Sequence, residues 1–138
     1  MKEISNMLLP NQEILVNLND YIQKNASVKT WVGRVKVNNT SPIVVFSEAR
    51  NELQTRSTTY DNTTRIINYN INIYCEKLVN SYEIVEELII LVTNVMQGYY
   101  NMTGGVIAII PTFDDNKASY QANLRFTTRY IPRNKKLY

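Results

Sequence analysis

The side chains that most often carry catalysis or metal binding are scarce in this chain of 138 residues. There is no histidine, so the usual general base and the commonest nitrogen ligand of metals are both missing. The single cysteine, Cys75, falls on the apolar side of an alternating segment, where a small buried hydrophobe is the favoured interpretation. A hydroxyl nucleophile needs a basic partner, and no Ser–Lys motif stands out. We therefore expect no enzyme, and neither a cofactor nor a metal.

Two acidic pairs and one glycine pair are the remaining candidates for chemistry. Successive residues of a helix point about 100° apart, so Glu86 and Glu87 do not converge on one site. That pair is interpreted as a solvated helix face, and Asp114-Asp115 is interpreted as part of a turn. Gly104-Gly105 lacks the spacing of a phosphate-binding loop, and we expect a turn there as well.

Positive charge is concentrated at the C-terminal end of the chain. The net charge is +3, yet the last fourteen residues contain no acid and five basic residues: Arg125, Arg129, Arg133, Lys135 and Lys136. Basic and aromatic side chains together can follow a phosphate backbone and stack on bases. Strand alternation, however, places Phe126 and Tyr130 on the side opposite the arginines. A solvated face with a basic tail at about 132–138 is favoured, and contact with an acidic protein or with nucleic acid stays open.

The apolar pattern predicts a single domain of two helices and five strands. Helices are expected at about 10–24 and 81–96. Strands are expected at about 30–37, 43–47, 65–75, 106–110 and 119–131. The longest apolar runs are too short for a membrane span or a signal peptide, so we expect a protein that stays in a reducing cytoplasm.

The segment 65–75 alternates strictly between apolar and polar residues, which indicates an antiparallel strand with one buried and one wet face. Its apolar side carries Ile67, Tyr69, Ile71, Ile73 and Cys75. Its polar side carries asparagines, and the last strand adds further polar residues to the same sheet face: Asn68, Asn70, Asn72, Asn123, Arg125 and Arg129. We expect a two-layer α+β fold, in which a mostly antiparallel sheet has both helices packed on its apolar face.

Two features lie outside this regular pattern. The polar segment 48–64 is expected to be a long loop, and loops of that length in compact domains are usually functional or disordered. Ile90 is alone among polar residues on the outer side of the second helix, which makes it a candidate for an interface. Single exposed apolar residues are also common without any such role.

Four segments resemble the tail terminator, or tail completion, proteins of tailed bacteriophages and of phage-tail-like contractile bacteriocins. They are SPIVVFSEARNELQTRSTTYDN, the alternating RIINYNINIYCEK, the helix SYEIVEELIILVTNVMQGYY and the closing YQANLRFTTRYIP. In that family a proline-led strand enters a long hairpin loop, a strand ending in IY leads to a helix, and a final strand returns through aromatic and basic residues. The resemblance covers about 42–132.

The resemblance implies a homohexameric ring, assembled in the bacterial cytoplasm, that caps the tail tube of a phage or phage-like particle and ends its growth. The ring would offer a docking surface to the head or, in headless particles, to a collar. Its partners would be its own copies, the tube protein and sheath, collar or connector proteins; nucleic acid would enter only as DNA passing through the lumen. A head–tail connector or minor tail protein is the alternative, and a small basic nucleic-acid-binding domain is a more distant one. The interface candidates are Arg50, Arg56, Arg65, Ile90, Arg125, Arg129 and Arg133.

Overall fold

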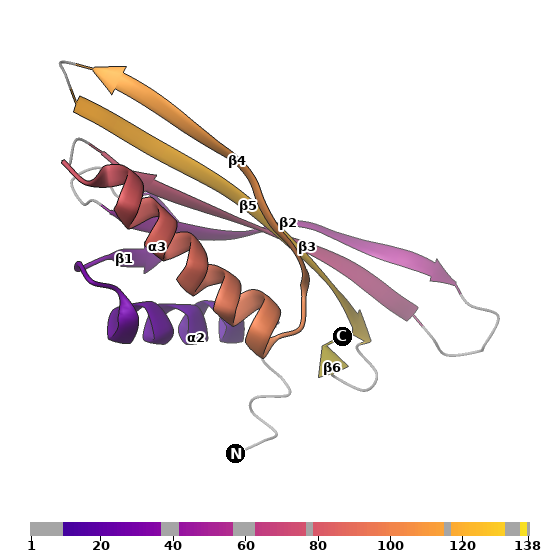
Figure 1. Cartoon of the computed structure of the whole chain (residues 1–138). Helices are drawn as coiled ribbons and strands as arrows, with labels where there is room; N and C mark the ends of the chain where they lie inside the picture. Colours follow the sequence, from indigo (N-terminus) through magenta and orange to yellow (C-terminus); the bar gives the residue numbers. More distant parts are fainter. Residues whose placement is uncertain are drawn as a thin grey trace.

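The computed structural model describes residues 10–36, 42–56, 63–76, 79–114, 117–131 and 136–137. These residues form a sheet in the order β1-β2-β3-β5-β4, with the short β6 paired to β5, and two helices lie on one face of that sheet (Figure 1). The predicted two-layer α+β fold with a mostly antiparallel sheet is confirmed.

The two expected helices are present. The first is α2 (Pro10–Asn25), with Glu13 in its first turn and Lys24 in its last turn, the arrangement that a helix dipole favours. The second is α3 (Ser81–Thr93), which continues into the π-helical segment η1 (Asn94–Tyr99). The helix ends where Asn101 takes a left-handed conformation with φ of 58°, and its N–H donates to the Gln97 carbonyl at 3.1 Å. Asparagine tolerates this conformation better than most residues, which explains the stop.

Four long strands and two short ones make up the sheet. They are β1 (Trp31–Gly33), β2 (Ile43–Arg56), β3 (Thr63–Cys75), β4 (Thr103–Asp114), β5 (Lys117–Ile131) and β6 (Lys136–Leu137). β1 runs parallel to β2, and every other described pair of strands is antiparallel. The β2–β3 and β4–β5 hairpins extend beyond the helices at opposite ends of the sheet (Figure 1).

The expectation of a long loop at 48–64 is wrong. β2 continues to Arg56, which pairs with Thr63 at the start of β3, and residues 57–62 lie outside the described part of the chain. Register shifts between Glu48 and Arg50, and between Leu53 and Thr55, interrupt this hairpin. A β-bulge inserts an extra residue into one strand while the strands on either side of it stay paired. The polar segment can therefore remain hydrogen-bonded to β3 in spite of these interruptions.

Two further boundaries differ from expectation. The strand expected at 30–37 is only three residues long, whereas the strand expected at 106–110 extends from Thr103 to Asp114. The turn expected at Gly104-Gly105 is therefore wrong, since both glycines lie in β4 and pair with β5. Of the expected Asp114-Asp115 turn, Asp114 ends β4 and Asp115 lies outside the described residues. Within the basic tail, 136–137 form β6, and 132–135 and 138 lie outside the described part.

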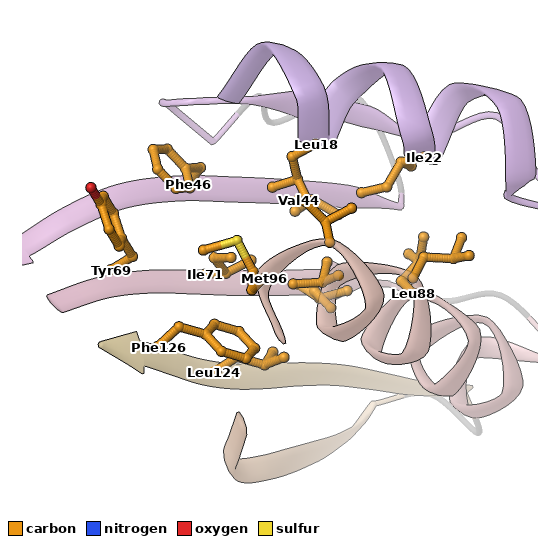
Figure 2. Packing of buried hydrophobic residues seen from close by; sticks show 14 of the residues in the cluster. Leu18, Ile22, Val44, Phe46, Tyr69, Ile71, Leu88, Met96, Leu124 and Phe126 are labelled. Atoms are coloured by element: carbon orange, nitrogen blue, oxygen red, sulfur yellow. The ribbon is translucent and has the colours of Figure 1, made fainter. Parts of the chain in front are cut away.

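The core lies between the helices and the apolar face of the sheet. Every apolar residue predicted for β3 is buried: Ile67, Tyr69, Ile71, Ile73 and Cys75. In Figure 2, Leu18 and Ile22 of α2 lie over Val44 of β2, and Met96 lies beside Ile71. The rings of Phe46 and Tyr69 stack at 5.4 Å between centroids. Each such large side chain contributes roughly 1.5–3 kcal/mol when fully buried, so this layer fixes which sheet face is left uncovered by the helices.

Candidate assembly surfaces

The sheet face away from the helices carries polar side chains along β3 and β5. The register of β3 and β5 places Asn68 opposite Thr127, Asn70 opposite Arg125, and Asn72 opposite Asn123. Directly opposed residues share a face, and both helices lie on the other one (Figure 1). The structure thus brings together most of the residues expected on this side. We name the polar face by its members: Asn68, Asn70, Asn72, Gln121, Asn123, Arg125 and Thr127.

Side-chain hydrogen bonds organise this polar face. The Thr127 hydroxyl donates to the Asn68 amide oxygen at 2.7 Å, and the Arg125 Nε donates to the Asn70 amide oxygen at 3.2 Å. Gln121 Nε2 donates to the Asn123 amide oxygen at 3.0 Å. These bonds hold the side chains of the polar face in defined positions.

A second surface follows the edge strand β4. Four apolar residues along it are exposed, with Ile107 at 60% and Phe113 at 75%; we call them the β4 apolar edge: Val106, Ile107, Ile110 and Phe113. The register places Val106 and Phe113 on the helix side of the sheet, whereas Ile110 pairs with Gln121 on the polar side. Apolar surface therefore wraps around the edge strand.

The backbone of this edge is poorly suited to pairing with another strand. Gln97 Nε2 donates to the Gly104 carbonyl, a register shift interrupts β4 between Val106 and Ala108, and Pro111 has no N–H. Such features protect edge strands from adding further strands. Within the described residues, no strand pairs along the outer edge of β4. This edge therefore exposes apolar side chains more than an open row of backbone groups.

A groove at the other edge of the sheet is the third surface. Its volume is about 380 Å³, and we call it the α2 groove by its lining residues: Gln12, Glu13, Leu15, Val16, Asn17 and Arg34. Arg34 directly follows β1, which is the edge strand on the side of the sheet opposite β4. Val16 is 57% exposed and Val35, beside Arg34, is 68% exposed. Exposed apolar side chains thus lie beside both edge strands of the sheet, β1 and β4.

The acidic residues of α3 diverge, as their spacing predicted. The Glu87 carboxylate accepts hydrogen bonds from the Ser27 N–H at 3.0 Å and from the Ser27 hydroxyl at 2.6 Å. Glu86 instead accepts a hydrogen bond from Tyr82, which raises the pKa of that phenol. Among the residues that the structure describes, no three His, Cys, Asp or Glu side chains gather where they could hold a metal ion.

The interface candidates named from sequence fall into two groups. Arg125 is exposed on the polar face, and Ile90 is 59% exposed on α3. Arg50 and Arg56 lie in β2, Arg65 in β3 and Arg129 in β5, but their side chains are outside the described part, as is all of Arg133. Sequence reasoning missed the β4 apolar edge. Its signal was the run VIAII, whose apolar residues do not alternate and so must occupy both sides of a strand.

Comparison of the chain with known protein families finds no match, and no curated protein matches its sequence. No helix in the described residues is long and apolar enough to cross a membrane.

Proposed function

We propose that this protein is a structural assembly protein whose copies form a ring at the end of a phage or phage-like tail tube. The ring ends tube growth and gives the head or collar a surface on which to dock. The observation that carries this proposal is the presence of two different exposed apolar surfaces, the β4 apolar edge and the α2 groove, at opposite edges of one sheet. A ring needs such unlike surfaces, because its contacts are head to tail.

The order of elements supports the tail terminator proposal. Pro42 leads into β2, the long β2–β3 hairpin follows, and β3, which carries Ile73-Tyr74 just before its last residue, is followed by the long helix α3. These are the features on which the family resemblance rests. In the proposed ring the polar face contacts another protein or lines the lumen, where a hydrogen-bonded amide surface stays wetted. The further partners are the tube protein and sheath or collar proteins, in a particle assembled in the bacterial cytoplasm.

Electron microscopy of particles from a strain that lacks this gene tests the proposal. We expect tubes that are longer and more variable in length than in the parent strain, because nothing stops polymerisation, and a plasmid copy should restore the parental length. A strain without the gene that assembles tubes of parental length, joined normally to their head or collar, would rule the proposal out.

A further inference from the structure

We propose that copies of this chain bind head to tail, with the β4 apolar edge of one copy seated in the α2 groove of the next. This inference rests on the proposed ring and identifies the two surfaces that build it. Both surfaces belong to the described part of the chain: one lies on β4, and the other lies on α2 and the residue after β1, the strand at the opposite edge of the sheet. A contact between them leaves one free edge and one free groove on every pair, so the same contact can repeat until the ring closes.

The two surfaces match in chemistry. The β4 apolar edge presents Ile107 and Phe113 as its most exposed side chains, and the groove presents Leu15 and Val16. A space of about 380 Å³ is within the range that accommodates a small ligand, so it can receive large side chains. Glu13 and Arg34 in the lining give the contact a polar component around an apolar centre, the usual anatomy of a protein interface.

Because the backbone of β4 is poorly suited to strand pairing, the β4 apolar edge is better matched by the α2 groove of a second copy than by the β4 strand of a second copy. A symmetric contact in which two β4 strands extend one sheet would depend on paired backbone groups, yet the Gly104 carbonyl is already bonded to Gln97 and Pro111 has no donor. That contact would also close on itself as a dimer and leave the α2 groove open. Side chains can bind in a groove without any backbone hydrogen bonds. The structure therefore favours the α2 groove of a second copy as the binding site of the β4 apolar edge.

Three lysine substitutions of exposed aliphatic residues test the contact in solution. Ile107→Lys alters the β4 apolar edge, Val16→Lys alters the α2 groove, and Val79→Lys, in the turn before α3 and on neither surface, is the control. We expect the first two to weaken self-association, measured by sedimentation velocity over a concentration series, by on the order of tenfold or more, because each buries a charge in an apolar contact. The control should associate like the parent protein.

Mixing the two contact variants gives the sharpest result. A Val16→Lys copy keeps an intact β4 apolar edge, and an Ile107→Lys copy keeps an intact groove, so the mixture should form one-to-one dimers that neither variant forms alone. Normal association of the Val16→Lys variant by itself would indicate a symmetric β4 contact and would overturn the inference. A lower unfolding temperature of Val16→Lys with unchanged association would mean that the chain fills its own groove, and this result would also overturn the inference.

Two results separate this inference from the proposed function. If the parent protein stays monomeric at every soluble concentration while the strain lacking the gene makes overlong tubes, the contact is wrong and the terminator role stands. If the three variants behave as expected while tubes of that strain have parental length, the protein self-associates through these surfaces but does not end tubes.

Discussion

At the scale of single residues, the backbone at Gly104 leaves no room for a side chain. Its φ is 125°, and an added Cβ would meet the Arg125 carbonyl oxygen and lie 3.0 Å from the Phe126 Cα. We expect Gly104→Ala to destabilise the fold by about 2–3 kcal/mol, because strained φ values cost about that much. Gly98→Ala is the control: nothing lies within 4 Å of its added Cβ, and helix propensity predicts a gain of up to about 1 kcal/mol. Urea unfolding of both variants measures this, and equal midpoints would contradict it.

The same residue shows what sequence reasoning could and could not give. Alternation in 65–75 predicted each buried residue of β3, because the period of a strand is set locally. The Gly-Gly pair was predicted to be a turn, since glycine is the usual turn residue. Its actual role comes from a contact with β5, a strand distant in sequence. Local patterns do not contain that close approach.

At the scale of elements, the hydrogen bond between α2 and the end of the second helix gives a pH-dependent contact. Tyr100 is 7% exposed, its hydroxyl accepts a 2.5 Å hydrogen bond from Asn17 Nδ2, and burial raises its pKa to about 12 from the ordinary 10.0. The unfolded chain therefore loses this proton at lower pH than the folded chain does. The resulting stability is complete below pH 10 and is lost as the pH rises towards 12.

We expect the parent protein to lose about 2 kcal/mol more stability between pH 9 and pH 12 than Tyr100→Phe does, at about 1.4 kcal/mol per unit of pKa difference. At neutral pH the variant should be less stable by about 1 kcal/mol, because the Asn17 amide loses its acceptor. Denaturant titrations at several pH values measure both effects. Tyr74→Phe, which removes the hydroxyl of a half-buried tyrosine on β3, serves as the control. Parallel pH profiles for the parent and Tyr100→Phe would disprove the role of burial.

The β2–β3 hairpin shows why element boundaries were harder to predict than element types. Residues 48–56 contain charged and amide residues with weak strand preference, and their sequence is typical of a loop. They become strand because β3 lies beside them with its backbone groups available, from Glu48 opposite Tyr69 to Arg56 opposite Thr63. The apolar side of β3 itself was fixed by burial, so it was predictable from sequence alone.

At the scale of the whole molecule, the candidate site depends on which elements lie at the ends of the sheet. The polar face was predictable, since alternation in β3 and β5 assigns it residue by residue. The β4 apolar edge and the α2 groove were not, because their exposure depends on the strand order, which places β1 and β4 at the two edges. In the proposed ring, apolar surfaces at opposite edges would let one molecule both donate and receive the same contact, as a head-to-tail ring requires.

Complementation of the strain that lacks the gene tests whether the β4 apolar edge is needed to end tube growth. A plasmid encoding Ile107→Lys should leave tubes as long and variable as an empty plasmid does, whereas Val79→Lys, at an exposed valine on neither surface, should restore parental length. The defect should be stronger in the particle than in a single pair of subunits, because every contact in a closed ring carries the same buried charge. Tube lengths from micrographs measure the outcome, and immunoblots confirm equal amounts of the two variants. Parental tube length with Ile107→Lys would show that the ring closes without the β4 apolar edge.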